Sequence, residues 1–221
     1  MNVYIWTSGV LKNDFIGEYT GRLPSWYQEV EYIQSSWTQY IDTWYTPTTS
    51  TRFAWKYNIT SKPTEYWVLM AVRSNSAYPP QNTLYIWWRN LSERQWLIYI
   101  MPSTYDYGNN SYWWTIWVDY EISYNGSVLK NGTSSINISF TSAPTKSIYL
   151  FANNDINGYT WNENWCAKLY YMKFYNSDTL VRDFVPCYRK SDSAIGLYDL
   201  VNNKFYANYW SWSFTKWADV N

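Results

Sequence analysis

Residues 51–59 read TRFAWKYNI, in which Phe53, Trp55, Tyr57 and Ile59 are separated by polar or small residues. In an extended chain this alternation places every second side chain on the same face, which is typical of a β-strand with one buried face. Residues 116–124 repeat the pattern with apolar or aromatic side chains at Ile116, Val118, Tyr120, Ile122 and Tyr124. Both segments are therefore predicted to be half-buried strands.

Shorter runs follow the same rule along the rest of the chain: Ile136, Ile138 and Phe140; Ile148, Leu150 and Ala152; and Leu169, Tyr171, Lys173 and Tyr175. The last run carries Tyr170, Met172 and Phe174 on its opposite face, so we expect it to be buried on both sides. Asn-Gly pairs at 125–126 and 131–132 mark turns between strands. Many short strands with such turns predict an all-β sandwich or barrel.

A chain of 221 residues is long enough for one sizeable β-sandwich. A possible boundary near residues 21–24 divides it into an N-terminal arm or hairpin, 1–22, and a main domain, 23–221. In the arm, Val3, Ile5 and Val10 alternate weakly, and Phe15-Ile16 is the expected return strand. Alone, such an arm buries too little apolar surface to be stable. We therefore expect it to pair with the sandwich edge or with another chain, which would make a homo-oligomer.

The charge balance argues against two classes of partner. Lysine plus arginine and aspartate plus glutamate each total 17, so no net charge attracts nucleic acid or an anionic membrane surface. No apolar run approaches the roughly 20 residues that span a bilayer, and residues 1–19 lack an uninterrupted hydrophobic signal segment. We expect a soluble chain without an export signal of its own.

Histidine is absent, and its absence limits the chemistry that the chain can perform. Nucleophile systems that pair serine or cysteine with histidine are excluded, as are histidine-ligated zinc sites. Any catalysis would depend mainly on carboxylates. The two cysteines, Cys166 and Cys187, are too few for a disulfide framework, and we expect both to be unpaired and structural.

Two stretches at the ends of the main domain carry a resemblance to a known family. The first comprises LPS at 23–25, EVEYIQS at 29–35 and TQYIDT at 38–43. The second comprises KLYY at 168–171, LVRDFVPC at 180–187, IGLYDLV at 195–201 and KFY at 204–206. Together they resemble the opening and closing segments of laminin G-like, concanavalin A-like domains, which are common in phage structural proteins and bacterial surface proteins.

The resemblance covers residues 23 to 220, strongly at both ends and weakly between them. It implies a two-sheet antiparallel jelly-roll sandwich whose chain ends close the structure. It also implies a role in carbohydrate or surface binding or in virion architecture, and it carries over no catalytic residue.

Departures from the family pattern are mostly of one kind, because tryptophan stands where the family has glycine. The positions are Trp37 and Trp44 in the opening segment and Trp210, Trp212 and Trp217 near the end. The chain has 8 glycines and 17 tryptophans, whereas an average chain of this length would have roughly 15 glycines.

Glycine suits turns because it lacks Cβ, and tryptophan at positive φ carries a steric penalty. One hypothesis is that many of these tryptophans are UGA codons that the source organism or its virus reads as glycine. The alternative is that the tryptophans are genuine and form an aromatic carbohydrate-binding surface.

Two pairs of acids raise the possibility of glycoside hydrolysis. Glu29 and Glu31 share a strand face, and so do Asp119 and Glu121, as two carboxylates acting across a glycosidic bond would need to. The glutamate-x-aspartate-x-glutamate pattern of sandwich glucanases is missing. A solvated strand face also explains both pairs, and we favour that explanation.

Asn153, Asn154 and Asp155 form an oxygen-rich segment after the run that ends at Ala152, and we expect it to be a loop. Such a loop could supply ligands to calcium or hydrogen bonds to sugar hydroxyls. Asparagine and aspartate are also good turn formers. The three residues are the ligand-binding prediction from sequence, with no other cofactor expected.

The sequence thus favours a non-catalytic module of a phage particle, in its tail, baseplate or capsid decoration, that contacts a glycan or a neighbouring virion protein. A bacterial cell-surface adhesin domain and a β-sandwich glycosidase are the alternatives.

Overall fold

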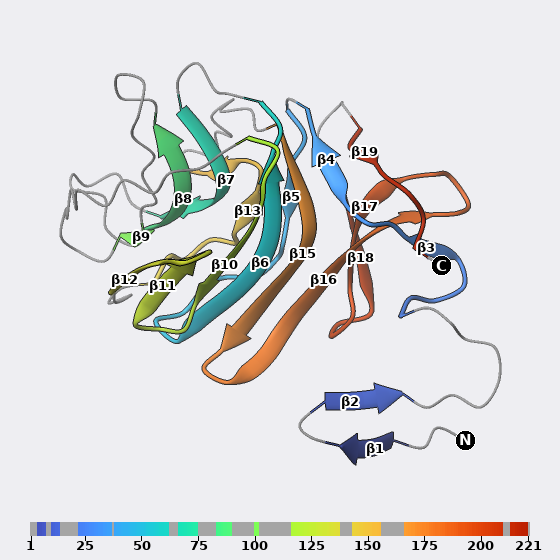
Figure 1. Ribbon diagram of the computed structural model, residues 1–221, viewed down its shortest axis with the longest axis horizontal. Helices are drawn as coiled ribbons and strands as arrows, with labels where there is room; N and C mark the ends of the chain where they lie inside the picture. Colours follow the sequence, from blue (N-terminus) through green and yellow to red (C-terminus); the bar gives the residue numbers. More distant parts are fainter. Residues whose placement is uncertain are drawn as a thin grey trace.

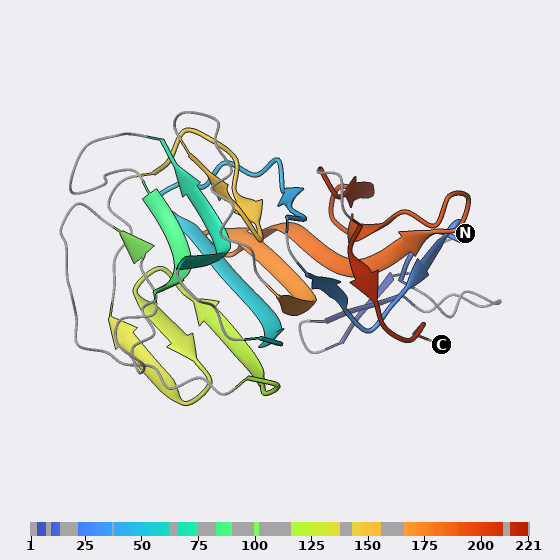
Figure 2. The same ribbon diagram turned by 90° about the horizontal axis from the view of Figure 1, so that it is seen from above.

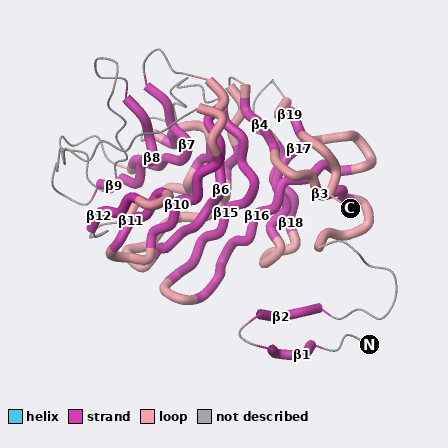
Figure 3. Tube along the Cα trace, viewed as in Figure 1, coloured by secondary structure: helices cyan, strands magenta, loops and turns pink. Residues whose placement is uncertain are grey.

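The computed structural model describes residues 4–7, 10–13, 22–36, 38–61, 66–74, 83–89, 100–101, 116–137, 143–155, 166–209 and 213–220. Over these residues the protein is all-β, built from strands and the loops between them, with two sheets packed together (Figures 1 and 3). No helix occurs among them.

The larger sheet has 11 strands, and its main path runs β12-β11-β10-β6-β15-β16-β17-β18. Three further strands, β3, β4 and β19, join it beside β15 and β16. All the strand pairings in the described part of this sheet are antiparallel. Its strands are β3 (Tyr27–Glu29), β4 (Ile33–Ser35), β6 (Thr51–Ile59), β10 (Asp119–Tyr124), β11 (Val128–Asn131), β12 (Ser134–Asn137), β15 (Ala167–Asn176), β16 (Thr179–Arg189), β17 (Ile195–Asp199), β18 (Lys204–Ala207) and β19 (Thr215–Lys216).

The smaller sheet has six strands in the order β5-β13-β7-β8-β9, with β14 paired to β7 in parallel. Its central strand, β7, contains the continuous apolar run from Val68 to Val72, in which every side chain is buried. The strands are β5 (Ile41–Asp42), β7 (Tyr66–Arg73), β8 (Thr83–Arg89), β9 (Ile100–Met101), β13 (Tyr149–Leu150) and β14 (Asn153–Asn154).

The main hydrophobic core lies between the two sheets. The larger sheet contributes Phe53, Trp55 and Phe174, among others, and the smaller sheet contributes Met70 and Leu150. Seen from above, the teal and green strands β7 and β8 lie on one side of β6 and β15, and β16 to β18 extend away from them (Figure 2). The alternating residues therefore bury one face of each sheet against the other.

The alternation predicted for residues 51–59 is confirmed, since Phe53, Trp55, Tyr57 and Ile59 are all buried on β6. For residues 116–124 the prediction holds at Ile122 and Tyr124 but is wrong at Val118, which is 41% exposed. The strand begins only at Asp119, because the backbone at Trp117 has a φ of 67° and interrupts the extended conformation.

The expectation that residues 169–175 are buried on both sides is wrong. The register between β15 and β6 shifts between Leu169 and Tyr171, which indicates a β-bulge. The bulge moves the buried face from Ala167 and Leu169 to Met172 and Phe174, leaving the tyrosines of the strand half-buried. The sequence of a strand that has one buried face and a bulge thus resembles the sequence of a strand that is buried on both faces.

Several shorter predictions can also be compared with the structure. Ile148, Leu150 and Ala152 are buried, as expected. Ile136 lies in β12, and the other two residues of its run fall outside the described residues. The Asn-Gly turns are confirmed, since Gly126 and Gly132 have φ values of 97° and 57° where β10, β11 and β12 connect. Both cysteines are free.

The two ends of the main domain meet on the larger sheet. β4 pairs with β19, and β3 pairs with β16. The backbone N–H of Val220 donates to the carbonyl oxygen of Glu29 at 3.0 Å, next to a bridge between Val30 and Asp219. A small second apolar cluster lies beneath this seam: Leu23, Val185, Cys187 and Tyr198.

The N-terminal arm is a hairpin of β1 (Tyr4–Thr7) and β2 (Val10–Asn13), which form a two-stranded sheet of their own. Thr7 is opposite Val10, so residues 8 and 9 connect the strands. The return strand is therefore Val10–Asn13, and the predicted Phe15-Ile16 lies outside the described residues. Neither strand pairs with the larger or the smaller sheet.

Candidate binding surface

The predicted oxygen-rich loop is a short strand and its end. Asn153 and Asn154 form β14, and together with Asp155 they are buried, at 5%, 8% and 3% exposure. Asn154 Nδ2 donates to the carbonyl oxygen of Ser147 at 2.8 Å, and Asp155 Oδ2 lies 3.6 Å from Arg73 Nη1. The structure brings the three residues together, but the side chains of Asn154 and Asp155 contact partners inside the protein.

These contacts give the segment a structural role, in a strand and not in the turn that asparagine and aspartate favour. Lys146 Nζ also donates to the carbonyl oxygen of Asp155 at 2.6 Å, which fixes the end of β14. Across the part of the chain that the structure describes, no three acidic, cysteine or histidine side chains converge as a metal site would require. The role of Asn153, Asn154 and Asp155 in ligand binding stays a prediction.

The two acid pairs lie in different surroundings. Glu29 forms an ion pair with Arg22, and Glu31 is exposed beside it. Partial burial raises the pKa of Asp119, but hydrogen bonds from Asn58, Lys56 and Tyr170 outweigh it and hold that pKa below its ordinary value. A general acid for glycoside hydrolysis needs the opposite shift. Asp119 is therefore suited to accept hydrogen bonds as an anion.

The larger sheet presents a set of aromatic and charged side chains on the face opposite the core, and sequence reasoning did not locate it. Lys56 lies between buried Trp55 and Tyr57, and Tyr170 follows buried Leu169, so both point away from the core. We call the set the outer-face cluster: Tyr32, Lys56, Asp119, Lys168 and Tyr170.

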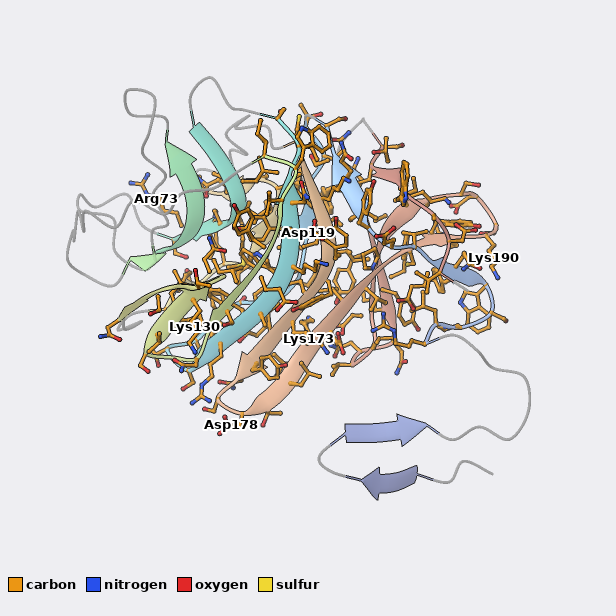
Figure 4. The ribbon with its side chains drawn as sticks, in the orientation of Figure 1. Arg73, Asp119, Lys130, Lys173, Asp178 and Lys190 are labelled. Atoms are coloured by element: carbon orange, nitrogen blue, oxygen red, sulfur yellow. The ribbon has the colours of Figure 1, made fainter. Side chains whose placement is uncertain are left out.

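Ion pairs, hydrogen bonds and ring contacts join the cluster across three adjacent strands. Asp119 Oδ2 lies 2.9 Å from Lys56 Nζ, and Asp119 Oδ1 accepts a hydrogen bond from the Tyr170 hydroxyl at 2.9 Å. Lys56 Nζ is 4.6 Å from the centre of the Tyr170 ring. Figure 4 shows Asp119 near the middle of the larger sheet, with Lys130 well away from it on β11.

Tyr32 extends the cluster toward the seam between the chain ends. Its ring meets that of Tyr170 edge-on, with centroids 5.3 Å apart, and Lys168 Nζ lies 4.2 Å from the Tyr32 ring centre. Beyond it, Trp217 stacks on Tyr32 at 6.0 Å and is 59% exposed. On the other side, Trp117 is 63% exposed and lies 5.7 Å from Lys168 Nζ.

Burial and a neighbouring charge keep the hydroxyl of Tyr170 protonated. Burial and the hydrogen bond to Asp119 raise the pKa of Tyr170 well above its ordinary value. The hydroxyl is therefore a hydrogen-bond donor throughout the neutral range. The cluster thus offers a hydrogen-bond acceptor in Asp119, a donor in Tyr170 and positive charge in the two lysines, all beside aromatic rings.

A second aromatic group lies where β5 approaches the end of β18. The Tyr40 ring lies 4.9 Å from that of Tyr149 and 5.5 Å from that of Tyr209. Burial, with the nearby charge of Asp42, raises the pKa of Tyr149 to about 12. Tyr209 is 63% exposed, so this group also reaches the surface.

The cysteines take no part in either aromatic group. Cys187 is buried in the small cluster beneath the seam, and burial raises the pKa of its thiol to about 12. The thiol form is therefore unreactive near neutral pH. Cys166 donates a hydrogen bond from Sγ to the carbonyl oxygen of Ser36 at 3.2 Å. Both cysteines are unpaired, as the sequence predicts, and Cys187 packs in the small apolar cluster.

No protein family, curated protein or solved structure matches the chain. Within the described residues, no helix has the length and apolar character that a membrane span requires.

Proposed function

We propose that the chain is a concanavalin A-like jelly-roll domain that serves as a non-catalytic binding module of a phage particle. In this proposal it belongs to the tail, baseplate or capsid decoration, and it contacts a host glycan through the outer-face cluster. The all-β fold with two packed sheets and the meeting of the chain ends support the family part of the proposal.

The outer-face cluster is the observation on which the binding role rests. Sugar rings have apolar C–H faces that pack on aromatic side chains and hydroxyls that need hydrogen-bond partners. The cluster offers both on one sheet face: the half-buried ring of Tyr170, the carboxylate of Asp119 and two lysines, with the ring of Tyr32, 7% exposed, packed behind them. Because the cluster spans three adjacent strands, it suits a chain of sugars better than a single small molecule.

A glycan array probed with the purified chain tests the binding role. Every glycan that binds is then titrated calorimetrically against Tyr170→Ala, Tyr170→Phe and Lys168→Ala. We expect Tyr170→Ala to weaken binding about 2- to 12-fold, the loss of one stacked ring, and Tyr170→Phe to weaken it less. Lys130→Ala, an exposed lysine on β11, is the matched control and should bind as the parent does.

Two results would contradict this role. Unchanged affinity in both alanine variants would place the glycan elsewhere on the molecule. A chain that binds no glycan would leave the neighbouring virion protein as the partner, which is then sought by isolating intact particles.

A bacterial surface adhesin would use the same face, so gene context separates it from the phage module. Tail or capsid genes beside this one favour a virion, and a signal peptide or a cell-wall anchor favours the cell surface. The glycosidase alternative gains no support from the lowered pKa of Asp119. Release of reducing sugar by the parent chain, lost in Asp119→Asn, would restore it.

A further inference from the structure

Two exposed tryptophans have a backbone conformation that disfavours them. Trp44 has a φ of 52° and Trp117 a φ of 67°, both in the left-handed region. There a Cβ crowds the neighbouring carbonyl oxygen, so bulky residues are genuine outliers. Three other left-handed positions hold small or polar residues instead: Ser177, Ser193 and Asn203.

Hydrogen bonds on both sides impose this conformation on Trp44. Its own N–H donates to Asp42 Oδ1 at 2.8 Å, and its carbonyl oxygen accepts from Arg182 Nη2 at 3.0 Å. The N–H of Thr43, the preceding residue, donates to the carbonyl oxygen of Ile148. The N–H of Ile148 in turn donates to the carbonyl oxygen of Tyr45, the following residue. The fold thus sets the turn, whichever side chain stands at position 44.

The same holds at Trp117, which begins the approach to β10. Its N–H donates to the carbonyl oxygen of Ile59 at 2.8 Å. Two residues later, Asp119 is already paired with Asn58 in the sheet. The chain must therefore turn at position 117 to enter the strand.

The indole rings contribute little that would compensate for the strain. Trp44 and Trp117 are 60% and 63% exposed, and each has a lysine ammonium near its ring, at 4.3 Å from Lys204 and 5.7 Å from Lys168. Phe151 is the instructive contrast, because it also has a positive φ, of 65°. Its ring is 3% exposed and packs on Phe214 in the core, so burial offsets its strain.

We propose that positions 44 and 117 are glycine in the protein as its source organism makes it, encoded by UGA codons that are read there as glycine. Glycine adopts left-handed φ without a steric penalty, and it would remove two exposed indoles from the surface. The structure extends this hypothesis to Trp117, which is not among the tryptophans that stand at glycine positions of the laminin G-like pattern. Trp217 does stand at a glycine position of that pattern, but its backbone is not left-handed.

This inference leaves the five residues of the outer-face cluster unchanged, because Trp117 is a neighbour of the cluster and not a member of it. With glycine at position 117, Lys168 keeps its contact with the Tyr32 ring at 4.2 Å and loses its indole neighbour. Recognition then rests on tyrosines and lysines. The inference itself does not depend on the proposed function.

The coding DNA and the native protein test it directly. We expect UGA at codons 44 and 117, and peptides of the natively produced protein should have the mass of glycine at both positions. UGG at either codon, or tryptophan in either native peptide, would overturn the inference.

A stability measurement on the chain with tryptophan gives a second, independent readout. We expect Trp44→Gly and Trp117→Gly each to raise the melting temperature by about 2 to 4 °C. Trp217→Gly is the matched control, since that tryptophan is equally exposed but not left-handed, and it should give no increase. Lower melting temperatures for the first two variants would count against the inference. These tests measure codons, peptide masses and melting temperatures, none of which depends on glycan binding. The glycine inference can therefore fail while the proposed binding role holds, and the binding role can fail while the glycine inference holds.

Discussion

Gly196 shows at the scale of one residue why this chain keeps a glycine inside a strand. A Cβ added there would lie 2.2 Å from the carbonyl oxygen of Tyr206 and 3.0 Å from the Phe205 ring. The first of these atoms belongs to the backbone of β18, so no side-chain rotation relieves the clash. The close pairing of β17 with β18 therefore requires glycine at this position.

Gly196→Ala should lower the free energy of unfolding by about 1–3 kcal/mol, because β18 must move away from β17. The midpoint of urea unfolding measures the effect. Ser135→Ala, at an exposed position on β12, is the control and should leave the midpoint unchanged. An alanine variant as stable as the parent would show that the two strands separate freely.

Asp119 connects two elements, since it begins β10 and accepts a hydrogen bond from Asn58 on β6 at 2.7 Å. Its folded-state pKa lies below the ordinary value, so the ionised form stabilises the fold. That contribution is fully present above the ordinary carboxyl pKa of about 3.9 and is lost as the pH falls through the lowered pKa.

Asp119→Asn should therefore reduce the loss of stability in acid. Melting temperatures measured from about pH 6 down to about pH 2 should fall less steeply in the variant than in the parent. Asp178→Asn is a suitable control, because that carboxylate is 90% exposed at the β15–β16 turn. Parallel curves for parent and Asp119→Asn would mean that the carboxylate contributes nothing to folding.

Among the elements, β6 could be predicted closely from the sequence, because its alternation is unbroken and its buried face is constant. β15 could not, since a bulge shifts the buried face partway along the strand and makes both faces look apolar. The start of β10 was misplaced for a related reason. Alternation continues through Val118 in the sequence, but the backbone turn at position 117 does not appear in a hydrophobic pattern.

At the scale of the whole molecule, the chain ends help to hold the sandwich closed. Phe214 precedes β19, is 2% exposed, and packs on Phe151 with ring centroids 5.4 Å apart. It belongs to the main core although it lies near the end of the described chain. Phe214 therefore anchors the segment that leads into the last strand in the core, although both residues of β19 are exposed.

Phe214→Ala should cost about 3–5 kcal/mol in the free energy of unfolding, as expected for a phenylalanine deleted from a core. Denaturant unfolding followed by tyrosine and tryptophan fluorescence measures it. Thr215→Ala, exposed in the next position, should unfold with the parent. A loss below about 1 kcal/mol would show that the C-terminal segment is dispensable to the fold.

The fold class followed from local alternation, whereas the outer-face cluster did not. Its residues come from positions 32, 56, 119, 168 and 170, and only the strand order and register bring them together. Register depends on pairings between distant segments, which no local pattern encodes. The predicted segment at Asn153–Asp155 is rich in oxygen atoms, but the sequence does not show that Asn154 and Asp155 are buried against Ser147 and Arg73.

The seam between Glu29 and Val220 brings the first strand of the larger sheet and the segment after its last strand within one hydrogen bond of each other. A host protein could therefore carry the domain within a single surface loop, without spreading the two loop ends. Such a domain can be gained or exchanged between carriers as one cassette, while the framework that displays it keeps its own fold.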